Sequence, residues 1–168
     1  IRLAQKWLKL WKKNNTHPIF ANSAESAYMV YLQSKERSLA KTKARNVYAD
    51  LLFNRKKYEK SSYEYEKVGQ YYFEIKEIIS KHKKALASKT LTKKYKAQAL
   101  TDLKVLKYNR TMAHDADYAA IVSLEQFNEA KNKGKWSDKG EARFKKLSNF
   151  YVTRYKKPKY QLDIQFKL

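Results

Sequence analysis

The sequence predicts an all-α fold, a helical bundle with two long antiparallel helices, shorter C-terminal helices and a C-terminal extended strand. Apolar residues recur at helical spacing through most of the 168 positions, and residues 65–86 carry a heptad seam. Strict alternation of apolar and polar side chains occurs only from residue 160 onward. We expect one domain with three parts: an amphipathic helix at 1–13, a helical bundle at 22–157 and an extended tail or strand at 158–168.

Residues 1–13, IRLAQKWLKLWKK, predict a short cationic amphipathic helix. Leu3, Trp7, Leu10 and Trp11 share one face, and the segment has five basic residues and no acidic residue. The tryptophan face either packs on the protein's own body, which is the simpler interpretation, or makes a peripheral membrane contact. The following NNTHP sequence ends this helix.

Two long helices are expected next. Asn22 followed by Glu25 resembles a capping box and predicts a helix that runs to about residue 57. Its apolar positions are Tyr28, Leu32, Leu39, Val47 and Leu51. The seam that predicts the second helix alternates steps of three and four residues through Tyr65, Val68, Tyr72, Ile75, Ile79, His82 and Leu86.

The C-terminal half predicts three shorter helices. Thr90 or Thr92 caps the first, Asp115 opens the second, and Pro158 ends the third. Their apolar positions are Tyr95, Leu100, Leu103 and Leu106, then Tyr118, Ile121, Val122 and Phe127, then Phe144, Leu147, Tyr151 and Tyr155.

The last nine residues, YQLDIQFKL, alternate like a β-strand. A lone strand has no ladder partner within the chain, so we expect it to add to the sheet edge of a neighbouring protein. An extended tail that packs across its own helices is the alternative. The residues of the apolar side, which we expect to contact the partner, are Tyr160, Leu162, Ile164, Phe166 and Leu168.

The net charge of +22 comes from 38 basic and 16 acidic residues. Lysine dominates the basic set, and lysine side chains are flexible point charges that suit phosphate backbones better than base reading. RNA is therefore the expected partner, with an anionic membrane next. The segment 111–131 reverses this pattern, since its acidic residues outnumber its basic ones.

Basic clusters mark the candidate RNA contacts. In YVTRYKKPKY, at 151–160, basic residues and tyrosines alternate beside a proline, which offers phosphate contacts next to rings on which bases stack. A solvated helix end is the alternative for this stretch. The predicted RNA-binding residues are Lys12, Lys13, Lys35, Arg37, Arg55, Lys56, Lys57, Lys93, Lys94, Lys96, Lys145, Lys146, Arg154, Tyr155, Lys156, Lys157 and Lys159.

Catalytic and metal-binding signatures are missing from the sequence. There is no cysteine, and three glycines provide no phosphate-cradling loop. His114 with Asp117 is a weak metal-ligand pair, and His82 falls in the heptad seam as a core residue. We expect no enzyme activity, no metal, no cofactor and no small-molecule substrate.

Residues 23–86 resemble the L29 family of large-subunit ribosomal proteins in its mitochondrial form. The similar segments are SAES at 23–26, YLQSKERSL at 31–39 and YEKVGQYYFEIKEIISKHKKAL at 65–86, with Met29-Val30 in place of the family's leucine-tryptophan pair. This resemblance implies a helical hairpin on the ribosome surface, with Lys35 and Arg37 facing rRNA. A rival resemblance links RSLAKTKARNVY at 37–48 to abalone sperm lysin, which implies a secreted protein that disrupts a glycoprotein coat.

The leading hypothesis is a non-catalytic structural subunit of a large ribonucleoprotein, an organellar (mitochondrial) ribosome, bound to rRNA and to neighbouring protein subunits. One alternative is a secreted cationic helical protein that acts on membranes or glycoprotein coats. Another is an accessory subunit of a respiratory or ATP synthase complex. The start at Ile1 agrees with a removed presequence, mitochondrial or secretory.

Overall fold

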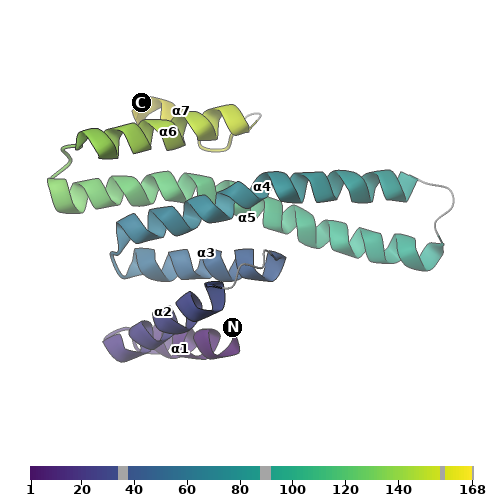
Figure 1. The fold of residues 1–168 in the computed structure, drawn as a ribbon, viewed down its shortest axis with the longest axis horizontal. Helices are drawn as coiled ribbons and strands as arrows, with labels where there is room; N and C mark the ends of the chain where they lie inside the picture. The colour runs from purple at the N-terminus through teal and green to yellow at the C-terminus, as the bar shows by residue number, and fades with distance from the viewer. Residues whose placement is uncertain (34–37, 88–91, 156–157, 168) are drawn as a thin grey trace.

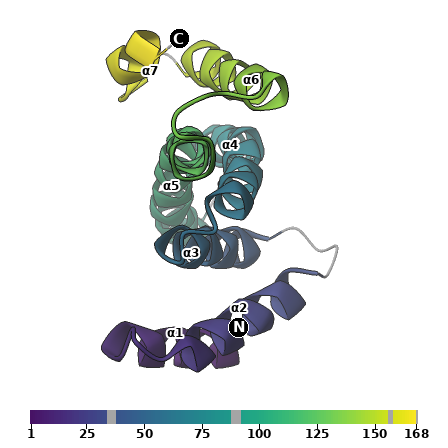
Figure 2. The same ribbon diagram turned by 90° about the vertical axis from the view of Figure 1, so that its left-hand side faces the viewer.

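The computed structural model describes residues 1–33, 38–87, 92–155 and 158–167, and confirms the all-α bundle. Two long antiparallel helices, α4 and α5, form its centre (Figure 1). Helices α6 and α7 lie on one side of this pair, and α3 lies on the other, with α2 and α1 beyond it (Figure 2). The helices are α1 (Arg2–Lys13), α2 (Pro18–Leu32), α3 (Leu39–Asn54), α4 (Tyr58–Ala87), α5 (Lys93–Asn132), α6 (Asp138–Arg154) and α7 (Gln161–Lys167).

The heptad seam forms the buried face of α4. Tyr65, Val68, Ile75 and Ile79 are all buried there. Where α4 crosses the middle of α5, the contact residues are small, which lets the two backbones approach closely. The Ser62 hydroxyl donates to the Ala120 carbonyl at 2.7 Å across this contact.

Three hydrophobic clusters hold the layers together. The largest joins α4, α5, α6 and α7 around Val68, Ile121 and Tyr151. The second joins α1, α2 and α3. The third is much smaller and joins the C-terminal half of α4 to the N-terminal half of α5, which project beyond the other helices (Figure 1). We call this projection, residues 75–87 and 93–107, the arm.

Three predicted helix boundaries are wrong. The segment 22–57 contains two helices, and Ser38 caps the second by accepting from the Lys41 amide. Asn22 is not a cap, because α2 already begins at Pro18, where proline's fixed φ suits the first helical turn. The two helices expected at 92–127 are one 40-residue helix, so Asp115 lies in the middle of α5.

The predicted C-terminal strand is also wrong, since Gln161–Lys167 is helical. The Ile164 amide donates to the Tyr160 carbonyl at 3.1 Å, so the helix satisfies backbone groups that a strand without a partner leaves open. Ile164 is fully buried, whereas Leu162 and Phe166 are 72% and 89% exposed. Leu168 lies outside the described residues.

No helix in the described ranges combines the length and the apolar character needed to cross a bilayer.

Candidate functional site

The two tryptophans of α1 pack partly against the protein's own helices, whereas Leu3 of the same predicted face is 59% exposed. Ala4 and Leu8 are buried against α2 and α3, and the Trp7 ring stacks on the Phe20 ring with centroids 5.9 Å apart. Inserting this face into a membrane would require α1 to leave its hydrophobic cluster. The intact fold therefore disfavours the membrane interpretation of this face.

Most arginines of the described chain form ion pairs between helices. Arg45 pairs with Glu64, and Arg143 pairs with Glu66 at 3.1 Å. Such pairs use arginine's planar fork of donors to fix helix orientation. Arginine therefore serves mainly inside the fold, and lysine supplies most of the outer positive charge.

Arg55 and Lys57, two of the predicted RNA contacts, both pair with one carboxylate. Arg55 donates to Glu25 of α2 and to the Asn22 side chain at 2.5 Å, and Lys57 donates to Glu25 at 2.7 Å. Glu25 is only 7% exposed. This pairing joins α2 to the turn between α3 and α4, so it is a structural contact. Lys56, between the two cations, is exposed and adopts φ = 58°.

Arg154 and Tyr155 are wrong as predicted phosphate contacts, because both side chains point into the bundle. The Arg154 side chain is 3% exposed and donates to Asp117 at 2.5 Å and to the Gly69 carbonyl at 3.1 Å. Tyr155 is 6% exposed and donates its hydroxyl to the same carboxylate. Burial raises the pKa of Asp117 and of Tyr155 above their ordinary values.

The rest of YVTRYKKPKY is also largely structural. The Tyr160 ring stacks on the Tyr118 ring at 3.8 Å, and Tyr151 is fully buried. Burial raises the pKa of Tyr151 to about 12. Lys159 is exposed and remains available to a ligand, with its ammonium 4.7 Å from the Tyr160 ring centre. Lys156 and Lys157 lie outside the described residues.

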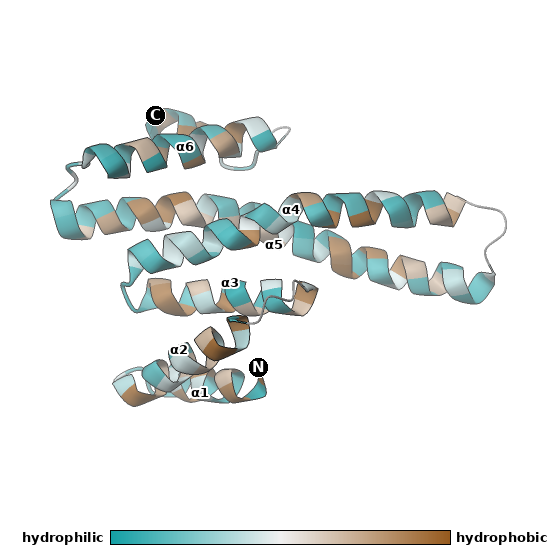
Figure 3. Ribbon diagram, in the orientation of Figure 1, coloured by the Kyte–Doolittle hydropathy of each residue, from teal (hydrophilic) through white to brown (hydrophobic). Residues whose placement is uncertain are grey.

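Lysines gather on the arm, where carboxylates are few. Only Glu77 and Asp102 are acidic within the arm, and hydrophilic bands alternate with hydrophobic ones along both of its helices (Figure 3). No arm lysine forms an ion pair with a residue that the structure describes. The arm lysines are Lys76, Lys81, Lys83, Lys84, Lys93, Lys94, Lys96, Lys104 and Lys107.

Four of these lysines lie along one side of α5. Lys93, Lys96, Lys104 and Lys107 are separated by steps of three, eight and three residues, which place them in a single stripe on a helix. At about 1.5 Å per residue the stripe is roughly 21 Å long. We call these four residues the α5 stripe. The sequence-based prediction found Lys93 and Lys96 but missed Lys104 and Lys107, although their spacing was a signal that helical periodicity could have found.

Two exposed rings lie on α5 near the arm's lysines. Tyr108, 65% exposed, follows Lys107, and the ammonium of Lys43 from α3 lies 5.3 Å from its ring centre. Tyr95, 66% exposed, lies in the first turn of α5. Tyr108 lies just beyond the arm at the Lys107 end of the stripe, and helical spacing places Tyr95 on a different side of α5 from the stripe, so the arm offers mainly positive charge for phosphate.

The other predicted contacts are scattered. Lys12 and Lys13 are exposed at the end of α1, and Lys146 is exposed on α6. Lys145, also exposed, pairs with Glu141 at 2.6 Å. Lys35 and Arg37 lie outside the described residues, and so does the part of the ribosomal resemblance that rests on them.

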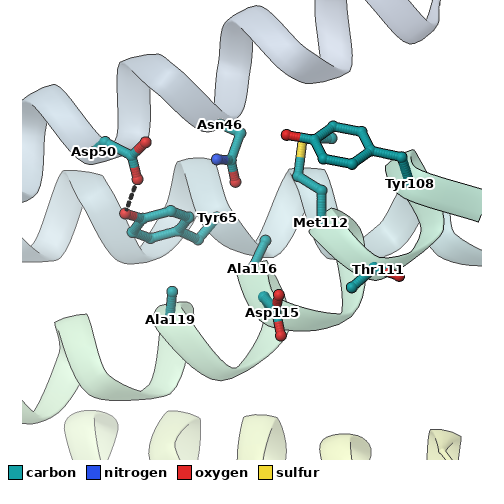
Figure 4. Close-up of a pocket in the computed structure, with 9 residues that line it drawn as sticks. All are labelled: Asn46, Asp50, Tyr65, Tyr108, Thr111, Met112, Asp115, Ala116 and Ala119. Carbon is teal, nitrogen blue, oxygen red and sulfur yellow. Dashed lines mark hydrogen bonds between the residues drawn. The ribbon is translucent and has the colours of Figure 1, made fainter. Parts of the chain in front are cut away.

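A pocket of about 260 Å³ opens between α3, α4 and α5 (Figure 4). Tyr65 donates its hydroxyl to Asp50 at 2.5 Å, and burial raises the pKa of Asp50. The Asp50 carboxylate therefore already accepts a hydrogen bond within the fold. The full lining is Asn46, Asp50, Tyr65, Tyr108, Thr111, Met112, Asp115, Ala116 and Ala119.

His114, the weak metal-ligand candidate in the sequence, packs within the fold. The His114 ring packs against Tyr155 with centroids 4.2 Å apart, and its Nδ1 lies 3.6 Å from Asp115. Burial lowers the pKa of His114. Within the described ranges, no three histidine, cysteine or carboxylate side chains are grouped as metal ligands.

Comparisons with known proteins add no assignment. No family model, curated protein or solved structure matches the chain.

Proposed function

We propose that the protein is a non-catalytic structural subunit of a large ribonucleoprotein and that it binds the RNA backbone through the arm. The observation that carries this proposal is the α5 stripe, four lysines on one side of a projecting helix with no ion-pair partner among the described residues. The assembly we favour is an organellar ribosome, that of the mitochondrion. A mitochondrial location follows from that choice.

Charge distribution supports backbone binding over base reading. Lysine ammonium groups neutralise phosphates and displace their counterions without distinguishing sequence. The arginines that suit bidentate base contacts are largely paired with carboxylates inside the fold. The partner is therefore a structured RNA recognised by its backbone.

We also propose that neighbouring protein subunits contact α7. Leu162 and Phe166 lie four residues apart and are largely exposed. Two apolar side chains at this spacing share one helical face and suit packing against another protein. This replaces the strand addition that the sequence suggested.

The salt dependence of binding to a structured RNA tests the RNA-binding function. Replacing Lys93, Lys96, Lys104 and Lys107 by Gln removes the α5 stripe. If all four contact phosphate, the slope of log K against log salt should become shallower by about 3 to 4, because each contact contributes about 0.7 to 0.9.

A matched control removes four positive charges elsewhere. Lys131 lies in the last turn of α5, Lys133 and Lys135 follow that helix, and Lys139 lies in the first turn of α6; all four are exposed. Their replacement by Gln should change the slope much less. Equal effects of the two variants would contradict binding through the arm, and preferential binding of the wild type to anionic vesicles would favour the secreted, membrane-active alternative.

A further inference from the structure

Helix α1 carries a second stripe of cations. Arg2, Lys6, Lys9 and Lys13 follow one another at steps of four, three and four residues and are all exposed. On a helix this spacing places them on one face. Ala4, Leu8 and Trp11 have similar spacing on the opposite face, which packs into the protein. We call the four cations the α1 stripe.

The α1 stripe has no local neutralising charge. Helix α1 contains no acidic residue, and none of the four cations forms an ion pair with a described residue. Glu25 on the adjacent α2 already binds Arg55 and Lys57. The stripe is therefore an uncompensated cationic row, and the packing of α1 holds it in place.

The two stripes lie on separate parts of the molecule. Helices α1 and α2 lie side by side, α3 lies between them and the central pair, and the arm projects beyond α3 (Figure 1, Figure 2). Helix α3, which contacts both α4 and α5, separates α1 from the central pair, and adjacent packed helices are about 8–10 Å apart. Lys9 and Lys13 border a groove that Tyr28 of α2 and Val47 of α3 also line, and all four cations of the stripe are exposed.

We infer that one molecule binds two RNA segments at once, one on the α5 stripe and one on the α1 stripe. This inference rests on the proposed RNA-binding function and adds a bridging activity to it. Two phosphate-binding surfaces on a rigid support hold distant RNA helices in a fixed relation, and simultaneous binding strengthens the overall attachment.

A capture assay tests the bridging. A short RNA duplex is immobilised and saturated with the protein, unbound protein is washed away, and a fluorescent copy of the duplex is added. We expect the wild type to capture the second duplex. Replacement of Arg2, Lys6, Lys9 and Lys13 by Gln should retain binding of the first duplex but reduce capture by about tenfold or more, because four phosphate contacts are removed.

The outcomes separate the inference from the function on which it rests. No binding of the first duplex by the wild type would overturn both. Binding without capture of the second duplex would overturn the bridging alone, as would undiminished capture by the α1 variant. The variant with Lys131, Lys133, Lys135 and Lys139 replaced by Gln is the control for net charge, and equal loss of capture there would also overturn the bridging.

Protein self-association is checked on the same complexes. We expect sedimentation to find one protein molecule with two duplexes. Complexes that contain two protein molecules would overturn bridging by a single chain. The substituted side chains are exposed, so unchanged helical circular dichroism should show that each variant is folded.

Discussion

The arm and the rest of the described molecule, which we call the body, share the long helices α4 and α5 but are stabilised differently. In the body, α4 and α5 are covered by α3 and α6, and the cluster there contains buried residues from several helices. In the arm, the buried set is only Ile75, Ile79, Leu103 and Leu106. The arm is therefore the part of the central pair with the least apolar burial to oppose its conformational entropy.

Among the described residues, ion pairs are also more frequent in the body than in the arm. Carboxylates of the body pair with cations on other helices, as Glu25, Glu66 and Asp117 do. Within the described arm, the closest approach of this kind is between His82 Nε2 and Asp102, at 3.9 Å, and it involves no lysine. Most carboxylates therefore lie in the body, and the lysines of the arm repel one another. A bound polyanion would reduce this repulsion.

The largest expected effect is in the body, at Gly69. A Cβ atom at this position would lie 1.6 Å from Oδ1 of Asp117, and the Gly69 carbonyl also accepts from Arg154. Gly69→Ala should therefore displace the Asp117 carboxylate from its buried partner and lower the free energy of unfolding by about 3 kcal/mol or more. Urea denaturation followed by circular dichroism measures this change.

Gly140→Ala is the matched control. Its added Cβ would lie 3.2 Å from Oγ of Ser137, near the exposed start of α6, and alanine favours helix by about 1 kcal/mol over glycine. We expect a change within about 1 kcal/mol. Similar losses in the two variants would show that the close approach to Asp117 is not the cause.

The next effect compares one buried isoleucine in each region. Ile121→Ala, in the body, should lower the global free energy of unfolding by about 2–5 kcal/mol, because it leaves a cavity in the largest cluster. Ile79→Ala removes one of four buried residues in the arm, so we expect local opening with a smaller global loss. Amide hydrogen exchange resolved by residue distinguishes the two results.

Exchange should rise in 76–86 and 99–107 in the Ile79→Ala variant and should fall again when a structured RNA is added. Uniform acceleration throughout α4 and α5 would mean that arm and body unfold as one unit. That result would remove the distinction between the regions.

Sequence patterns predicted the helices that local periodicity determines. The seam through Val68, Ile75 and Ile79 was sufficient for α4. Residues 93–133 contain neither glycine nor proline, a signal that α5 is continuous, but Asp115 was interpreted as a cap that opens a new helix. At the C-terminus the alternating pattern also places Tyr160 and Ile164 four residues apart, so a short segment satisfied both periodicities and the surrounding helices determined the outcome.

The candidate site was harder to predict because charge alone does not reveal pairing. Arg154 lies among lysines in the sequence, yet its partner Asp117 is 37 residues away. The acidic excess at 111–131 was the available signal, since a carboxylate-rich helix in a cationic protein offers partners to arginines elsewhere. The lysine stripes were accessible in principle, because they follow from helical spacing once the helix bounds are known.

The smallest expected effect is the pH dependence that His114 contributes to the body. Its Nε2 lies 3.4 Å from the Tyr151 hydroxyl, and burial lowers the pKa of His114 below its usual value of 6.5. The unfolded chain therefore binds a proton at this histidine more readily than the folded chain. Its contribution to stability is complete above about pH 6.5 and is lost as the pH falls toward the lower folded-state pKa.

His114→Gln removes this titration. The difference in free energy of unfolding between wild type and variant should be constant above about pH 7 and should shift in favour of the variant as the pH falls through 6.5. Taking the difference cancels the opposite contributions of Asp50 and Asp117, whose raised pKa values favour the folded state at low pH. A difference that does not change with pH would mean that folding leaves the proton affinity of His114 unchanged. Packing against Tyr151 and Tyr155 would then not remove this ring from water.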